Sequence, residues 1–163
     1  MRQVVIPHYG APGVLDVREA PTPVPGPGDV RIAVRAAGVN FADVMARQGL
    51  YPDAPRPPIV PGYEVAGVVD AVGAGVTRVR EGDRVVALTR FGGYATSAVA
   101  PEGFAFRSPA TLSDVEAAAL PVNYLTALLA LYRLADISPG ETVLILGAGG
   151  GVGIAATQLA RLG

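Results

Sequence analysis

Residues 142–156 read TVLILGAGGGVGIAA, an aliphatic run followed by a glycine-rich turn and a run of small residues. This order predicts a buried strand, Thr142–Leu146, that leads through a tight turn into a helix. Glycines in such a turn let the backbone approach a pyrophosphate, and the N-terminus of the helix then presents its N–H groups to the negative charge. The stretch therefore predicts the start of a dinucleotide-binding βαβ unit. The sequence stops ten residues after Gly153, before such a unit would be complete.

The composition limits the classes of protein that the chain can represent. A chain of 163 residues, half of them hydrophobic, can bury the core of one domain, or of one domain and the beginning of another. The net charge of −1 gives no reason to expect nucleic acid or an anionic membrane surface as a partner. Cysteine and lysine are absent, which excludes thiol nucleophiles, cysteine-based zinc sites, Schiff-base chemistry and a Walker-type phosphate loop.

Two apolar stretches bear on membrane targeting. The N-terminal residues Met1–Pro7 contain too short an apolar run for a signal peptide. Residues 142–160 are uncharged and long enough to span a bilayer, but the glycines at their centre favour a strand, a turn and a helix. We therefore expect a cytoplasmic protein without a membrane span.

The first hundred residues alternate short β-type runs with turns rich in glycine and proline. The predicted strands are Val4–Ile6, Val14–Arg18, Val30–Ala36, Val65–Val72, Arg84–Leu88 and Tyr94–Ala100. A short helix is predicted over 40–48, where Gly49 closes it. This part of the chain is therefore expected to be rich in β-structure.

Helical patterns replace the strands after residue 112. The capping box Ser113-Asp114-Val115-Glu116 predicts a helix over Asp114–Leu120, and leucines at helical spacing predict another over Asn123–Leu134. We therefore expect a β-rich domain over 1–121 and the beginning of an α/β domain over 122–163.

Six short motifs follow one another along the chain: Gly-Pro-Gly-Asp-Val (26–30), Gly-Val-Asn-Phe-Ala-Asp (38–43), Pro-Gly-Tyr-Glu-Val-Ala-Gly-Val-Val (61–69), Gly-Asp-Arg-Val (82–85), Glu-Ala-Ala-Ala-Leu-Pro (116–121) and Ala-Gly-Gly-Gly-Val-Gly (148–153). In this order they resemble the medium-chain dehydrogenase/reductase superfamily, and within it the zinc-independent quinone oxidoreductase branch. Residues 40–51 are especially similar to the vesicle amine transport protein homologues of that branch. The resemblance implies a mixed α/β fold, in which a GroES-like β-barrel domain is followed by the first strand, turn and helix of a truncated Rossmann domain.

The resemblance also implies a nicotinamide cofactor. The residues that match the family's phosphate loop are Ala148, Gly150, Gly151, Val152 and Gly153, and Thr126 matches a threonine that contacts the nicotinamide. A glycine turn can instead pack a helix without any ligand, and a threonine inside a helix can bond its own i−4 carbonyl. NADP is the expected cofactor and NAD is the alternative, because the residue that reads the adenosine ribose would fall beyond Gly163.

A catalytic metal is not expected. In the zinc enzymes of the superfamily a Cys, a His and a Glu hold the ion, whereas Asn40 stands near the place of the Cys and Tyr63 replaces the His beside Glu64. The single histidine, His8, lies in a loop and cannot complete a zinc site with one distant carboxylate. Without a Lewis acid, hydride transfer to a conjugated carbonyl is easier to support than interconversion of an alcohol and a ketone.

Asn40 and Tyr51 are the predicted catalytic residues. By resemblance Asn40 also lies beside the nicotinamide and Tyr51 lines the substrate cleft, where each can hydrogen-bond the electrophile. Asn40 can alternatively cap the helix that starts at Phe41, and Tyr51 can anchor a proline-rich loop. Weaker candidates for the cleft are Tyr63, Arg90 and Phe91, whereas Glu64 and the pair Asp83-Arg84 are interpreted as structural.

These features predict the N-terminal portion of a NAD(P)H-dependent, zinc-independent oxidoreductase that reduces a quinone or another α,β-unsaturated carbonyl. The alternatives are a GroES-like binding protein without catalysis and an enoyl-thioester reductase of the same superfamily. The expected partner is a small-molecule substrate. The full-length protein is expected to form a homo-oligomer, most simply a dimer, and the uncovered strand Thr142–Leu146 predicts that the chain itself associates.

Overall fold

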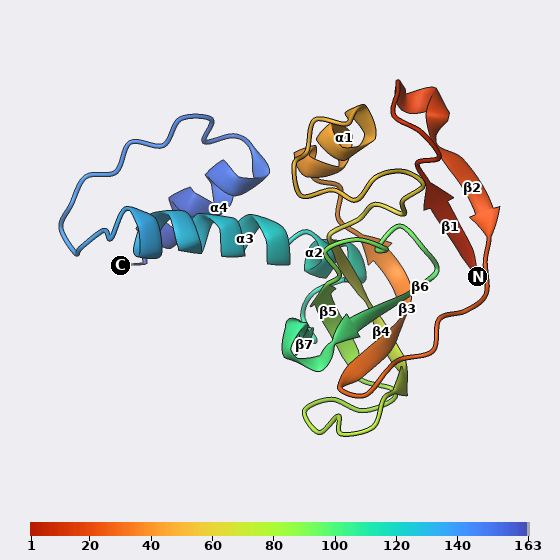
Figure 1. Ribbon diagram of the computed structural model, residues 1–163. Helices are drawn as coiled ribbons and strands as arrows, with labels where there is room; N and C mark the ends of the chain where they lie inside the picture. Colours follow the sequence, from red (N-terminus) through yellow and green to blue (C-terminus); the bar gives the residue numbers. More distant parts are fainter. Residues whose placement is uncertain (163) are drawn as a thin grey trace. The chain divides into compact units, whose positions relative to one another are not determined.

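The computed structural model describes residues 1–162 and divides into two compact units, one on each side of the Ala119–Leu120 bond (Figure 1). The first unit contains seven strands and two α-helices, and the second contains two α-helices and a π-helical turn. The chain therefore has the mixed α/β composition that the sequence predicts.

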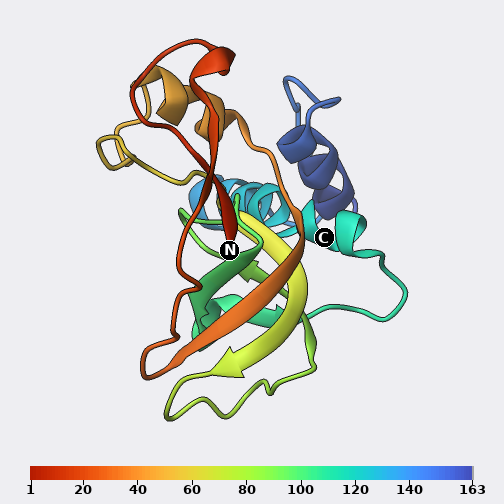
Figure 2. The ribbon, with the colours of Figure 1, turned by 90° about the vertical axis from the view of Figure 1, so that its right-hand side faces the viewer.

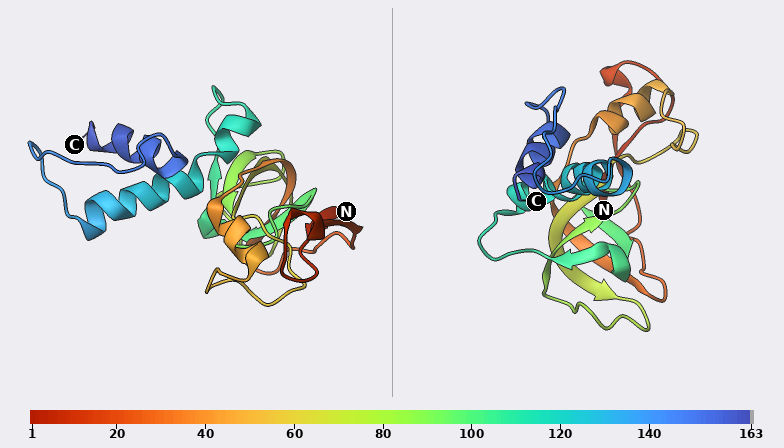
Figure 3. Two further views of the ribbon diagram at one scale, coloured as in Figure 1. Left: turned by 90° about the horizontal axis from the view of Figure 1, so that it is seen from above. Right: turned by 90° about the vertical axis from the view of Figure 1, so that its left-hand side faces the viewer.

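A five-stranded antiparallel sheet forms the centre of the first unit. Its strands are β3 (Asp29–Ala37), β4 (Glu64–Val72), β5 (Arg84–Leu88), β6 (Ser97–Pro101) and β7 (Ala105–Arg107), in the spatial order β6-β3-β4-β5-β7. The sheet is strongly curled (Figures 2 and 3). Register shifts between β3 and β4, at Arg31/Ile32 and Val34/Ala36, mark the irregularities that allow a strand pair to bend in this way.

Alternating small and branched residues of these strands form the core inside the curl. Its larger fully buried members are Val30, Ile32, Val65, Val69 and Val85, with Ala87, Ala100 and Ala105 between them. The two long strands also approach each other closely, since a Cβ on Gly67 would stand 2.1 Å from the carbonyl oxygen of Ala33. Glycine is therefore required at this point of β4.

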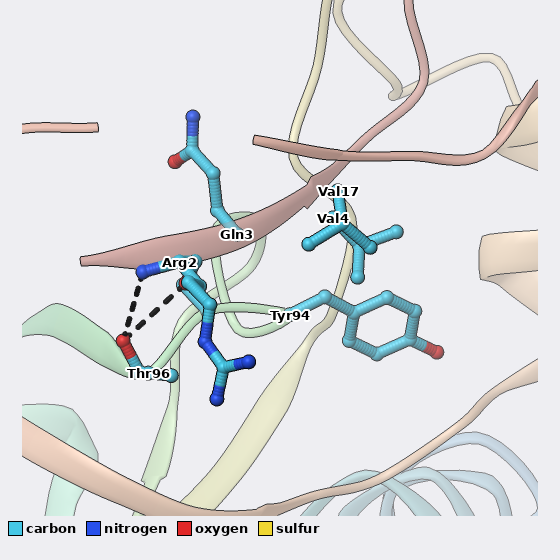
Figure 4. A pocket seen from close by; sticks show the side chains of 7 residues that line it. Arg2, Gln3, Val4, Val17, Tyr94 and Thr96 are labelled. Atoms are coloured by element: carbon cyan, nitrogen blue, oxygen red, sulfur yellow. Dashed lines mark hydrogen bonds between the residues drawn. The ribbon is translucent and has the colours of Figure 1, made fainter. Parts of the chain in front are cut away.

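A second, two-stranded sheet consists of β1 (Arg2–Val5) and β2 (Asp16–Glu19), which pair antiparallel. It is tied to the segment before β6, because the Arg2 N–H donates to Thr96 Oγ1 at 3.1 Å and the Thr96 hydroxyl donates to the Arg2 carbonyl at 3.4 Å (Figure 4). The Thr96 N–H also donates to the Arg2 carbonyl, at 2.9 Å. The Val4 N–H likewise donates to the Tyr94 carbonyl at 2.8 Å. The N-terminal strand therefore holds the backbone of Tyr94.

Two helices complete the first unit, namely α1 (Phe41–Gln48) and α2 (Asp114–Ala118). The predicted capping box of α2 is confirmed: the Glu116 N–H donates to Ser113 Oγ at 3.3 Å, and the Glu116 carboxylate accepts the Ser113 N–H at 2.9 Å. The Ser113 hydroxyl also donates to this carboxylate at 2.7 Å, and this bond, followed by the bond from the Ser113 N–H, lowers the pKa of Glu116.

In the second unit, α3 (Pro121–Leu128) continues into the π-helical turn Leu129–Leu134, and α4 (Gly151–Ala160) packs beside α3. Their shared core contains four buried residues: Ala127, Leu131, Ala155 and Ala156. The Tyr132 hydroxyl donates to the Leu159 carbonyl at 2.8 Å and closes one end of this core. The helices predicted after residue 112 are thus present, with the second starting at Pro121.

The predicted buried strand Thr142–Leu146 is wrong for this structure. Its backbone is not in a sheet, and although Val143 and Ile145 pack on the core of the second unit, Leu144 and Leu146 are 85% and 87% exposed. A strand of a parallel sheet is defined by hydrogen bonds to its neighbours. Residues 1–162 contain no strand that pairs with this segment.

Two smaller predictions of secondary structure also need correction. The strand predicted over Val14–Arg18 begins only at Asp16, because Pro12–Val14 forms a turn of 3₁₀ helix that starts with a proline. Strand β7, only three residues long, was not predicted, since a run this short carries no periodic pattern.

One helical stretch of the described chain, Asp114–Leu134, is long and apolar enough to cross a membrane, with a mean hydropathy of 1.4. Helices in the cores of other proteins meet the same criterion, so this stretch by itself does not identify a membrane protein. The uncharged stretch 142–160 contains only the ten-residue helix α4.

Candidate functional site

Asn40 lies at the N-cap of α1, directly after the turn that follows β3. Its backbone N–H donates to Asp43 Oδ2 at 2.8 Å, as in a capping box. Its side-chain Nδ2 donates at 2.9 Å to Oε1 of Glu64, the first residue of β4. Asn40 therefore occupies the N-cap position, but among the described residues its side chain makes no capping hydrogen bond and instead bonds Glu64.

Glu64 is 1% exposed and has little freedom to move. A Cβ on Gly38 would stand 2.2 Å from Glu64 Oε1, so a side chain at position 38 would displace the carboxylate. Because a carboxylate oxygen accepts hydrogen bonds and an amide oxygen cannot donate one, this contact directs the NH₂ group of Asn40 toward Glu64. The amide oxygen and one N–H of Asn40 remain for other partners.

Asp43 is the centre of a buried hydrogen-bond network that the sequence did not predict. The carboxylate is 6% exposed and accepts three bonds: from the Asn40 N–H, from the Gly62 N–H at 3.0 Å and from the Tyr94 hydroxyl at 2.9 Å. Burial, and then the charge of Asp43 and this hydrogen bond, raise the pKa of Tyr94. The tyrosine therefore remains a hydrogen-bond donor at neutral pH.

Three aromatic residues proposed from the sequence come together in the first unit. The rings of Tyr51 and Tyr63 meet edge to face with centroids 5.9 Å apart, and the rings of Tyr63 and Phe91 lie 5.0 Å apart. Within the described residues, the buried hydroxyl of Tyr63 has no hydrogen-bond partner. Burial, and then the neighbouring Tyr51, raise the pKa of Tyr63, so this hydroxyl also remains protonated.

A cavity of about 460 Å³ adjoins this aromatic cluster. It is lined by Tyr63, Leu88, Thr89, Arg90, Pro101 and Phe104. Tyr63 and Arg90 were proposed from the sequence, whereas the apolar lining was not, because it comes from strand ends that are brought together only by the sheet. The Thr89 hydroxyl donates to the Gly62 carbonyl at 2.8 Å, so this donor stabilises the wall of the cavity. A second cavity, of about 220 Å³ beside β1, contains none of the predicted site residues (Figure 4).

The glycine turn of the second unit leads into α4. The first bond of the helix runs from the Ile154 N–H to the Gly150 carbonyl at 2.8 Å, so the N–H groups of 151–153 precede the hydrogen-bond ladder and point out of the N-terminus. A Cβ on Gly153 would stand 2.2 Å from the Gly147 carbonyl oxygen, and one on Gly151 would stand 2.5 Å from Asn123 Oδ1. Gly151 and Gly153 therefore allow close packing at the start of α4, as expected for a glycine turn that packs a helix.

The side of the turn formed by Gly149 and Gly150 is open. A Cβ on Gly149 would meet no atom within 4 Å, and one on Gly150 would meet only the Gly147 carbonyl oxygen, at 3.5 Å. This open side next to the helix N-terminus fits the pyrophosphate of a dinucleotide. Ala148 and Val152 belong to the same turn and first helical residues, and Thr126 is exposed on α3.

Within residues 1–162, no three His, Cys, Asp or Glu side chains gather in an arrangement that could hold a metal ion. Asp43 and Glu64 are the buried carboxylates of the first unit, and each accepts hydrogen bonds from neighbouring protein groups.

Comparison with known proteins agrees with this geometry. Residues 26–110 match the family of the alcohol dehydrogenase GroES-like domain. The chain is 49% identical over 147 residues to the synaptic vesicle membrane protein VAT-1 homolog of Rattus norvegicus, and the match covers 90% of this chain and 36% of that protein.

Two solved structures are similar to 99% of the chain. The human synaptic vesicle membrane protein VAT-1 homolog-like protein matches with a TM-score of 0.95 and 39% identity over 52% of its length. The quinone oxidoreductase from Thermus thermophilus, solved also in complex with NADPH, matches with a TM-score of 0.86 and 42% identity over 50% of its length.

The chain therefore belongs to the alcohol dehydrogenase GroES-like family, in the medium-chain dehydrogenase/reductase superfamily. Its relatives include quinone oxidoreductases and VAT-1 homologues, which confirms the resemblance carried by the six sequence motifs. The chain spans between about a third and a half of the lengths of the relatives named above.

Proposed function

We propose that the chain is part of a NAD(P)H-dependent oxidoreductase that transfers hydride to a quinone or another α,β-unsaturated carbonyl. The cavity of about 460 Å³ beside the rings of Tyr51, Tyr63 and Phe91 carries this proposal. Aromatic faces and apolar walls suit a planar conjugated ring, and such an electrophile needs orientation and modest hydrogen bonding more than it needs a metal ion. In this proposal 1–121 forms the substrate domain and 122–163 begins the cofactor domain.

NADP is the proposed cofactor, with NAD as the alternative. The turn over 148–153 would hold the pyrophosphate, with the N–H groups at the start of α4 directed at its charge, and Thr126 would contact the nicotinamide. When bound, the reduced nicotinamide supplies the hydride, and a quinone that accepts it together with one proton from water becomes the hydroquinone.

The residues of the first unit would orient the acceptor and stabilise the negative charge that develops on its oxygen. Tyr51 would donate a hydrogen bond to that oxygen, while Tyr63, whose pKa is raised by burial, would remain neutral and support the ring of Tyr51. Asn40, held by Glu64, would offer its amide oxygen to a donor on the nicotinamide side of the site. Asp43 and Tyr94 would fix the backbone around this amide.

For the full-length protein we further propose a cytoplasmic homodimer that acts on a small molecule. Quinone oxidoreductases among the relatives support the small-molecule substrate. Size-exclusion chromatography with light scattering measures the oligomeric state of the full-length protein and of the 163-residue chain.

The test is oxidation of NADPH and of NADH by the purified full-length protein with a panel of acceptors. The panel contains simple quinones, enones and an enoyl thioester, with a chelator and without added metal. We expect turnover with a quinone or an enone. Turnover with the thioester alone would favour the enoyl reductase, and no turnover with any acceptor would refute the proposal.

A separate measurement distinguishes the enzyme from a binding protein that lacks catalysis. A ligand that binds only the folded state raises the melting temperature, so NADPH should stabilise a protein with an intact cofactor site. The absence of a shift in the full-length protein, together with no turnover, would support the binding protein.

A further inference from the structure

One cationic side chain lines an otherwise uncharged cavity. Of the six residues that line the cavity of about 460 Å³, Arg90 is the charged one, and Leu88, Pro101 and Phe104 provide the apolar walls. The Thr89 hydroxyl already donates to a backbone carbonyl. The guanidinium is therefore the charged group in this lining that can form an ion pair with an anion.

The backbone holds Arg90 at the cavity in a conformation that arginine seldom adopts. Its φ is +59°, and the Phe91 N–H donates to the Thr89 carbonyl at 2.6 Å, which makes Arg90 the central residue of a γ-turn. Left-handed backbone is unfavourable for a residue with a side chain and persists where the surroundings enforce it.

Two backbone bonds enforce this turn from its flanks. The Thr89 N–H donates to the Tyr63 carbonyl at 2.8 Å, and the Gly92 N–H donates to the Val60 carbonyl at 2.8 Å. The glycine at 92 also has a positive φ, of 89°. Backbone hydrogen bonds therefore fix the loop from which the side chain of Arg90 extends.

Arg90 differs from the arginines that form ion pairs with carboxylates. Five arginines of the described chain form ion pairs with carboxylates: Arg18, Arg31, Arg80, Arg84 and Arg107. Arg90 is exposed and, within residues 1–162, forms no ion pair. The carboxylates that act on the neighbouring Tyr63 are Asp43, which accepts three hydrogen bonds of its own, and the exposed Asp53. The charge of Arg90 is thus available to a ligand.

We propose that the cavity takes conjugated carbonyl substrates that carry an anionic substituent, a carboxylate or a sulfonate, and that Arg90 pairs with it. The apolar part of the substrate would lie against the walls of the cavity, while the planar guanidinium binds the two oxygens of the anion side by side. This inference rests on the proposed function, because it names the substrate class of the same site.

The kinetic test compares a matched pair of acceptors, 1,2-naphthoquinone and 1,2-naphthoquinone-4-sulfonate, in the full-length protein. For Arg90→Gln we expect kcat/KM for the sulfonate to fall tenfold or more, chiefly through KM, with less than a twofold change for the neutral quinone. Arg90→Gly relieves the left-handed strain and should give the same result if the charge is what matters. Arg35→Gln removes an exposed arginine of β3 and should change neither value.

An equal loss of kcat/KM for both quinones would show that Arg90 only maintains the cavity. No loss for either quinone would show that Arg90 does not bind the anionic substituent. Either result would overturn the inference while leaving the proposed function intact. If neither quinone is turned over, the proposed function fails, and binding decides the inference separately. Naphthalene-2-sulfonate, titrated by calorimetry, should then bind the wild type at least tenfold more tightly than Arg90→Gln, with an affinity that falls as salt is added. Equal affinities of wild type and Arg90→Gln would refute the inference.

Discussion

Exchange of Asn40 for aspartate tests whether the half-buried amide is held by a carboxylate. Asn40→Asp has nearly the same shape, but it removes the N–H donor that lies 2.9 Å from Glu64 Oε1 and places a second carboxylate there. Hydrogen bonds to charged groups contribute about 1.5–3 kcal/mol, and the acceptor Glu64 is buried. We therefore expect the free energy of unfolding to fall by about 2 kcal/mol at neutral pH, or roughly 4–8 °C in melting temperature.

The second half of the test reverses donor and acceptor. Glu64→Gln alone keeps an oxygen that can accept from Asn40 and should cost about 1 kcal/mol. In the double variant the new amide at position 64 can donate to the new carboxylate at position 40, so at least about 1 kcal/mol should be recovered relative to the sum of the single variants. Urea denaturation of all four proteins measures this coupling.

The pH dependence of Asn40→Asp has a defined sign. Two carboxylates at this distance raise the pKa of one of them in the folded state, with Asp43 and Tyr94 as the neighbouring titratable groups. A raised folded-state pKa makes the variant most stable, relative to wild type, below the unfolded-state pKa of about 4, and the deficit grows as the pH rises.

Two results would refute this reasoning. One is additivity of the single variants, since it means that the two side chains do not interact. The other is a deficit that does not change between about pH 4 and pH 8. As a control, Asp70→Asn exchanges a carboxylate for an amide in a surface pair with Arg31, where the aspartate side chain is 38% exposed. Exposed pairs contribute at most about 1 kcal/mol, so this change should be small.

Three further predictions concern other parts of the chain. Gly153→Ala should distort the glycine turn and abolish the NADPH-induced rise in melting temperature of the full-length protein, whereas Gly13→Ala, which lies outside the turn and whose Cβ would meet no atom within 4 Å, should keep it; equal behaviour of the two would contradict the packing argument. Tyr94→Phe should lower the free energy of unfolding by about 1 kcal/mol in urea denaturation, because a buried carboxylate loses one of its three donors, and an unchanged value would show that this bond does not stabilise the fold. The Glu102 pKa is lowered, first by the backbone N–H of Arg78, so the stability that wild type has over Glu102→Gln should be present above about pH 4.5 and lost on acidification in thermal melts; a difference independent of pH would argue against it.

The sequence predicted features that depend on local chemistry. The capping box at Ser113 follows from residue types three positions apart, the N-cap position of Asn40 follows from its residue type before a helix, and both are present in the structure. The ordered motifs identified the family and its mixed α/β fold. They also pointed to the rings of Tyr51, Tyr63 and Phe91, which the structure brings together.

Features that depend on distant contacts were missed. The Asp43–Tyr94 bond joins residues 51 positions apart, and no spacing in the sequence indicates it. Glu64 was interpreted as structural, although its partner is the predicted catalytic residue Asn40. The strand predicted over Thr142–Leu146 failed for a related reason, since its aliphatic pattern is right but a strand also needs a neighbour.

The loop at 89–92 has a consequence for how related proteins diverge. The bonds that flank its turn are donated by backbone N–H groups, and the side chains of Arg90 and Phe91 take no part in them. Mutations at these two positions can therefore change the surface offered to a ligand while the hydrogen bonds of the loop stay in place. We expect variation to accumulate here among proteins with different substrates, and a combinatorial library at positions 90 and 91 to yield many folded variants with altered selectivity.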